Sequence, residues 1–94
     1  MSLGVLTLYF HIPGCTSLKE KRRRIKPLLH RLHREFNISV AEIEHHDIWQ
    51  NTIIACALIS NDNKFTQRKL LQVAKWVETH WPDLTMIENH IEII

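Results

Sequence analysis

The sequence predicts an α+β fold with four strands and two helices in the order βαββαβ. Four stretches of strand length either alternate apolar and polar residues or stay apolar throughout. Two longer stretches repeat apolar residues at spacings of three and four, and residues typical of turns separate the segments. With 94 residues, 45% of them hydrophobic and 23% charged, the chain has the size and composition of a single globular domain spanning residues 1–94.

The first predicted strand covers residues 5–12, where side chains alternate between two faces, and a Pro-Gly turn ends it. A helix over residues 17–36 follows. Ser17 and Glu20 fit a capping box, in which the Ser17 hydroxyl accepts a hydrogen bond from the amide of Glu20 and the Glu20 carboxylate reaches back. Asn37 is suited to end the helix in the left-handed conformation. The apolar residues that share one face of this helix are Leu18, Ile25, Leu28, Leu29, Leu32 and Phe36.

The second and third predicted strands cover residues 38–45 and 50–60. In the second strand, Val40 and Ile43 have opposite parity, which predicts either a bulge or apolar contact on both faces. The centre of the third strand is apolar on both faces, a pattern typical of a strand in the middle of a sheet.

The last two elements are a helix over residues 63–80 and a strand over residues 84–94. Asn61 or Asp62 is suited to cap the helix. The strand alternates apolar with polar residues, and its polar side predicts a position at the edge of the sheet.

Short loops and right-handed crossovers arrange these elements as a ferredoxin-like sandwich. The predicted sheet is antiparallel, its strand order is 4-1-3-2, and both helices cover one face. This topology brings the start of the first helix next to the turn between the second and third strands. The helix-free face would carry Val5, Tyr9 and one set of side chains from the third strand. Because an exposed apolar patch is unusual for a monomer, we expect a homodimer through this face, or a partner that covers it.

The segment 17–36 makes the molecule basic. It holds eight of the twelve Lys and Arg residues and carries a net charge of +6, whereas the rest of the chain sums to −4. Four of the cations are consecutive, at positions 21–24. They cluster near the N-terminus of the predicted helix, where the helix dipole disfavours cations but favours a bound anion. Phosphate is such an anion and RNA is a polymer of it, so we expect RNA or the ribosome as the partner.

Two of these cations, Lys21 and Arg22, fall within about 60° of the centre of the apolar face by helical geometry. Because Lys is almost never fully buried, we expect this end of the helix to overhang the sheet edge. The predicted anion- or RNA-binding residues are therefore Ser17, Lys19, Lys21, Arg22, Arg23, Arg24 and Lys26, flanked by Trp49 and Gln50 from the nearby turn. An ordinary solvated helix face is the plainer alternative.

The RNA-recognition modules that share this fold stack bases on aromatic residues of both central strands. Here Tyr9 lies on the first strand, but the third strand has no aromatic residue. We therefore expect RNA to contact the first helix and the turn rather than the sheet, and we expect no sequence-specific binding of DNA.

An enzyme is the main alternative to RNA binding. Acylphosphatases have this size and fold and hold phosphate in the loop before the first helix, but their glycine-rich loop with a single arginine is missing from residues 11–21. Asn51 is the only suggestive counterpart. No Ser-His-Asp set, pair of catalytic carboxylates or phosphate-loop motif is evident, so we expect no catalytic residue and no enzyme. A small phosphate-ester or acyl-phosphate hydrolase and a dimeric protein-interaction scaffold with no anion site stay open as alternatives.

The sequence gives little support for a metal or a cofactor. His45, His46 and Asp47 are candidate ligands, but a metal needs three or four ligands, and adjacent histidines on a strand point to opposite faces. Cys15 and Cys56 lack the spacing of a metal pair and are expected to be reduced thiols of a cytoplasmic protein. The longest apolar run, seven residues, is far shorter than the roughly 20 that span a bilayer, and no secretory signal is evident, so we expect no membrane partner.

Three stretches resemble the YlxP-like domain-of-unknown-function family of bacterial proteins: SLKEKRR at 17–23, NISVAEIEHHDIWQ at 37–50 and SND at 60–62. The resemblance extends from Gly4 through the last strand. It implies a ferredoxin-like βαββαβ fold and no established activity. Such proteins are often encoded beside translation-initiation and ribosome-maturation factors, which implies a ribosome- or RNA-linked role by association.

Overall fold

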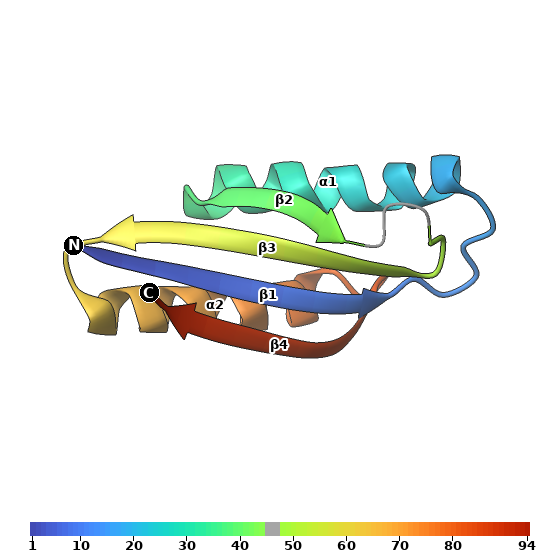
Figure 1. The fold of residues 1–94 in the computed structure, drawn as a ribbon. Helices are drawn as coiled ribbons and strands as arrows, with labels where there is room; N and C mark the ends of the chain where they lie inside the picture. Colours follow the sequence, from blue (N-terminus) through green and yellow to red (C-terminus); the bar gives the residue numbers. More distant parts are fainter. Residues whose placement is uncertain (45–47) are drawn as a thin grey trace.

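The computed structural model describes residues 1–44 and 48–94, and its elements follow the predicted order (Figure 1). They are β1 (Ser2–His11), α1 (Leu18–Phe36), β2 (Ser39–Glu44), β3 (Asn51–Ser60), α2 (Asn63–His80) and β4 (Thr85–Ile93). Every strand pairing is antiparallel, and the sheet order is β2-β3-β1-β4, which is the predicted order read from the other edge. The ferredoxin-like fold is therefore confirmed.

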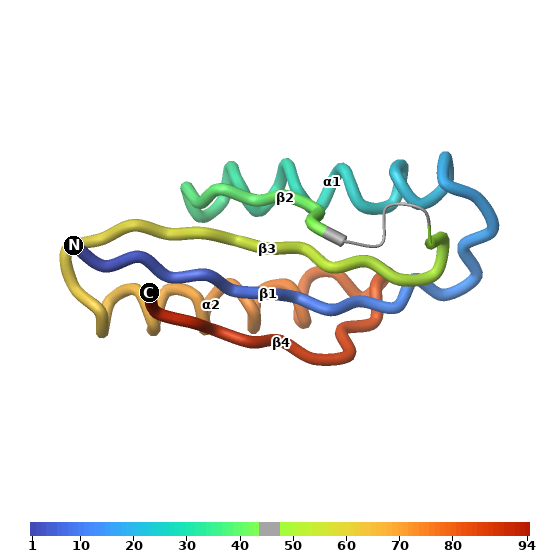
Figure 2. The backbone as a smooth tube through the Cα atoms, viewed as in Figure 1, coloured from blue at the N-terminus to red at the C-terminus, as the bar shows by residue number. Residues whose placement is uncertain are grey.

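The two helices form one layer behind the sheet, α1 alongside β2 and α2 alongside β1 and β4 (Figure 1). Both chain ends lie at the same end of the sheet (Figure 2), where the amide of Ile94 donates to the carbonyl oxygen of Leu3 at 2.8 Å. The opposite end carries the connection from β1 to α1 and the connection from α2 to β4. The least exposed core residues between the layers are Leu6, Leu8, Phe10, Ile12, Leu28, Leu32, Ile54, Cys56, Leu70, Val73 and Val77.

The helix ends agree with the sequence. The Ser17 hydroxyl accepts from the amide of Glu20 at 3.1 Å, as the capping box predicts, although the Glu20 carboxylate contacts Thr16 and Arg24 instead of reaching back. Asn37 ends α1 in the left-handed conformation, with φ of 51°. At the start of α2 the cap is Asp62, whose carboxylate accepts hydrogen bonds from the amides of Lys64 and Phe65. These amides have no acceptor within the helix.

Two strands of the sheet are irregular. The predicted bulge in β2 lies between Glu42 and Glu44. Before the bulge, Val40 and Glu42 lie on the helix side, opposite Cys56 and Ile54 of β3. A second irregularity in β4 lies opposite Tyr9 and Phe10 of β1 and shifts the alternation there. Because Glu42 precedes the bulge and is two residues from Val40, this acidic side chain points toward α1 rather than toward the open face.

The helix-free face carries the other side chains of the two central strands. Val5 and Tyr9 of β1 and Ala55 and Ala57 of β3 are half-buried on this face, and Ile59 near the end of β3 is 67% exposed. The predicted apolar patch is therefore present.

Candidate nucleic-acid interface

Lys21 lies inside the protein, which corrects the expectation that this end of α1 overhangs the sheet. The residue is 2% exposed, and its Nζ lies 3.0 Å from Oε2 of Glu42 and donates to the carbonyl oxygen of Ile48 at 2.7 Å. The same Glu42 oxygen accepts from the hydroxyl of Thr52 at 2.5 Å. The cost of burying the ammonium is offset by an opposite charge and by oxygen acceptors, as buried charges require.

The burial of Lys21 also means that Arg22 lies further from the core than the sequence predicted. The buried stripe of α1 runs through Lys21, Ile25, Leu28, Leu32 and Phe36, so the centre of this stripe is shifted toward the lysine. Arg22 lies about 100° further around the helix and is exposed, although the sequence placed it near the apolar face. Lys21 and Arg22 therefore do not form a common cationic surface.

Arg24 joins three parts of the chain. Its guanidinium donates to the Asp83 carboxylate at 3.0 and 3.3 Å, to the Asp83 carbonyl oxygen at 2.9 Å and to the carbonyl oxygen of Pro13 at 2.6 Å. Its Nη1 also lies 3.5 Å from the carboxylate of Glu20. The hydrogen bond to Asp83 raises the pKa of Arg24 above its ordinary value. Arg24 thus connects α1 to the loop between β1 and α1 and to the loop between α2 and β4.

Two further predicted contacts have structural partners. Gln50 donates from Nε2 to the carbonyl oxygen of Cys15 at 3.1 Å, and its own carbonyl oxygen accepts from the amide of Ile12 at 2.7 Å. The hydroxyl of Ser17 is engaged as the helix cap. These bonds confirm that the start of α1 lies beside the residues just before β3, which the topology predicted.

The remaining predicted cations share the outward side of α1. Lys19, Arg22, Arg23 and Lys26 recur at spacings of three, four and seven and are all exposed. Arg34 continues the same row two turns later. We call these five residues the outer stripe. Among the side chains of residues 1–43 and 48–94, no ion pair involves any of them.

Sequence reasoning missed part of this stripe. Arg34 and the exposed His30 and His33 lie in the same row of the helix, and the signal was their spacing from Lys26 of eight, four and seven residues. Arg31, by contrast, lies on the side toward α2, where it pairs with Glu35 at 3.1 Å and sits 5.3 Å above the ring of Trp76. The two acids of α1, Glu20 and Glu35, lie outside this row of the helix.

Trp49 is the aromatic residue nearest in sequence to these contacts. It is 43% exposed and lies between Ile48 and Gln50, which bond to Lys21 and Cys15 respectively. Its ring is thus available near the first turns of α1. The candidates His45, His46 and Asp47 lie outside the described residues.

Among the described side chains, the cysteines and other possible metal ligands do not gather into a second site. Cys15 and Cys56 are both free and buried, and burial raises the pKa of the Cys56 thiol to about 12. Apart from the side chains at positions 44–47, no three His, Cys, Asp or Glu residues lie close enough together to hold a metal ion. Within the described chain, no helix has both the length and the apolar character of a membrane span.

Comparison with known proteins gives a family and a fold. The family model described as "Protein of unknown function (DUF503)" matches residues 3–91. The "Uncharacterized protein YlxP" of Bacillus subtilis (strain 168) is 36% identical over 63 residues, which are 67% of this chain and 68% of that protein.

Two solved structures are similar in fold alone. A candidate antibiotic biosynthesis monooxygenase from Chloroflexus aurantiacus J-10-fl is 13% identical, with a TM-score of 0.58 over 100% of this chain and 93% of that chain. A dimeric protein of unknown function and ferredoxin-like fold from Bacteroides fragilis NCTC 9343 is 14% identical, with a TM-score of 0.41 over 99% of this chain and 94% of that chain.

Proposed function

Since this chain belongs to the DUF503 family, whose members are described as proteins of unknown function, we infer its role from its own surface. We propose that the protein binds RNA, including RNA exposed on the ribosome, through the outer stripe of α1. The observation that supports this proposal is a row of five exposed cations with no ion pair to any described residue.

The dimensions of the stripe suit a phosphate backbone. Lys19 and Arg34 are fifteen residues apart, which is about 22 Å along a helix. Five phosphate contacts would release five counterions, so the slope of log K against log salt would be roughly −3.5 for a single strand and −4.5 for a duplex. The stripe carries no aromatic side chain, so it would recognise backbone and shape rather than sequence.

A membrane surface fits this helix less well than RNA. Helices that lie on membranes insert apolar side chains beside their cations. In α1 the apolar side chains Ile25, Leu28 and Leu32 are buried against the sheet. A lipid surface would therefore meet charge alone, whereas RNA needs little more than charge and an aromatic surface such as Trp49.

The proposal is tested with a fluorescent 20-nucleotide single-stranded RNA, a 20-base-pair RNA duplex and a DNA duplex of equal length. Arg22→Glu with Arg23→Glu should weaken binding to RNA at least tenfold at low salt. The alanine pair at the same positions should reduce the steepness of the salt slope by about 1.4 for the single strand and about 1.8 for a duplex, since two phosphate contacts are lost. Lys21 is left unchanged because its replacement would test folding.

The matched control is Lys64→Glu with Lys75→Glu, which makes the same change in charge on exposed positions of α2. It should leave RNA binding within about twofold, because the change in net charge is the same and only the location differs. Equal losses in both variants, or no RNA binding by the wild type at low salt, would overturn the proposal. Preference for the DNA duplex would replace RNA by DNA as the ligand.

We further propose a binding module rather than an enzyme. In the loop before α1, the carbonyl oxygens of Pro13 and Cys15 accept hydrogen bonds from Arg24 and Gln50. Arg24 and Gln50 could otherwise bind a phosphate at this loop, but they are held by its backbone carbonyl oxygens. Turnover of a generic phosphatase substrate that is lost on Asn51→Ala would favour the hydrolase alternative instead.

The helix-free face supports a second proposal, a homodimer formed by this face. Its half-buried Val5, Tyr9 and Ala55 and its exposed Ile59 form an apolar surface between more polar edges. Light scattering should give twice the chain mass of 11.2 kDa for the wild type and the single mass for Ile59→Asp. A monomeric wild type at high concentration would contradict the dimer without affecting the RNA proposal.

A further inference from the structure

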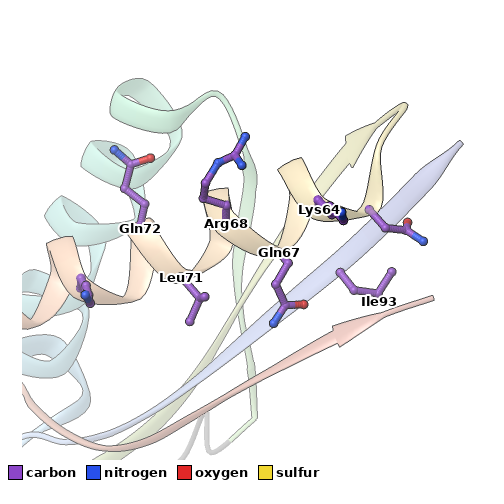
Figure 3. A pocket seen from close by; sticks show the side chains of 8 residues that line it. Lys64, Gln67, Arg68, Leu71, Gln72 and Ile93 are labelled. Atoms are coloured by element: carbon purple, nitrogen blue, oxygen red, sulfur yellow. The ribbon is translucent and has the colours of Figure 1, made fainter.

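A groove of about 1060 Å³ runs along the outside of α2 beside the end of β4 (Figure 3). Gln67 and Leu71 point from α2 toward β4, where Ile93 lies opposite them, while Arg68 rises on the other side of the helix. Lys64 and Lys75 of α2 also line the groove. The groove is separate from the outer stripe, which lies on α1.

Strand β4 leaves backbone hydrogen-bonding groups at this groove. It is the last strand of the sheet and pairs with β1 alone among the described strands. The amide of Ile94 donates to Leu3 of β1, so the backbone groups of Ile94 point inward. In an antiparallel pair the direction alternates, so the N–H and C=O groups of Asn89, Ile91 and Ile93 point away from β1.

The chemistry of the lining is basic around an apolar floor. Lys64, Arg68 and Lys75 are exposed, and no acid is among the lining residues. Leu71 is 46% exposed although it is a large apolar side chain on a helix. It lines the same groove as Ile93 (Figure 3). Such a surface is complementary to a segment that carries acids together with apolar residues.

We propose that this groove binds an extended acidic segment of a partner protein, which adds to the sheet as a fifth strand beside β4. The backbone of the segment would bond to the outward groups of Asn89, Ile91 and Ile93, as in other cases of strand addition. Alternate side chains of the segment would face α2, where apolar ones contact Leu71 and acidic ones meet Lys64 and Lys75.

A second copy of this chain fits the groove less well. The acids of β4 are Glu88 and Glu92, which lie opposite Tyr9 and Val5 of β1 and therefore on the helix-free face. A β4 strand from another copy would place its acids on that face too, away from the lysines of α2. RNA would use the cations but neither the apolar floor nor the strand edge.

The test uses a fluorescent ten-residue peptide of alternating Glu and Val, with an alternating Lys and Val peptide as its charge control. The acidic peptide should bind at 150 mM salt, and the basic peptide should bind at least tenfold more weakly. Lys64→Glu with Lys75→Glu should weaken the acidic peptide at least tenfold, whereas Arg22→Glu with Arg23→Glu on α1 should change it less than twofold. Equal binding of both peptides would overturn the proposal.

Hydrogen exchange separates strand addition from simple ion pairing. On binding, the amides of Asn89, Ile91 and Ile93 should become protected, and N-methylation of alternate peptide amides should abolish binding for one of the two possible sets only. Binding without protection of these amides would overturn strand addition. Displacement of the peptide by the RNA duplex, or formation of a chain dimer that competes with it, would assign the groove to that ligand instead.

Discussion

Lys21 and Arg22 are neighbours in α1, yet the first is 2% exposed and bonded to Glu42, while the second lies in solvent without an ion pair to a described residue. The same contrast divides the whole helix. Lys21, Arg24 and Arg31 pair with acids, whereas the outer stripe pairs with none in the described chain. Charge density alone therefore does not identify a binding surface, because in α1 part of it holds the fold together.

The largest effect on stability is expected from Lys21→Met, which keeps the length of the side chain and removes its charge. Losing one partner of a buried pair costs about 3–5 kcal/mol, and because Glu42 stays partly hydrated we expect a loss of about 2–3 kcal/mol in the free energy of unfolding. Denaturant unfolding followed by circular dichroism measures it. Arg22→Met, one residue away, should change stability by less than about 0.5 kcal/mol.

A double variant sharpens this prediction. Lys21→Met with Glu42→Gln removes both charges, so it should be less destabilised than the sum of the two single variants. Additive losses, or equal losses for Lys21→Met and Arg22→Met, would show that the buried pair does not distinguish the two sides of the helix.

A smaller effect is expected from Arg24→Ala. Asp83 is a surface partner, so we expect the loss of its hydrogen bonds and of the bond to Pro13 to cost about 1 kcal/mol. The thermal midpoint should fall for Arg24→Ala and stay nearly unchanged for Arg23→Ala, whose side chain is exposed and makes no ion pair to a described residue. An equal fall for both would contradict a structural role for Arg24.

Local patterns in the sequence predicted most of the fold. The cap at Ser17, the left-handed Asn37, the bulge after Val40 and the edge position of the last strand each depend on residues close in sequence. These features are confirmed because capping, parity and turn chemistry act over a few residues.

The candidate site was predicted less completely, since its partners are distant in sequence. Lys21 bonds to a carbonyl oxygen 27 residues away, and Arg24 to an acid 59 residues away. The burial of Lys21 further depends on Glu42 of β2, which lies on the helix side of the sheet, opposite Ile54. Helical spacing alone could have found the outer stripe and the i,i+4 pairs Glu20–Arg24 and Arg31–Glu35. No local pattern shows that Lys21 pairs with Glu42.

The buried ion pair has one more consequence, which concerns the azimuth of α1. Successive residues advance by about 100° around a helix axis, so fixing one side chain fixes the rotation of all the others. The Glu42 carboxylate, 3.0 Å from Lys21, therefore acts together with the buried Ile25 and Leu28 to set which side chains of α1 meet the solvent. A residue of β2 that never touches the outer stripe thus helps to define it.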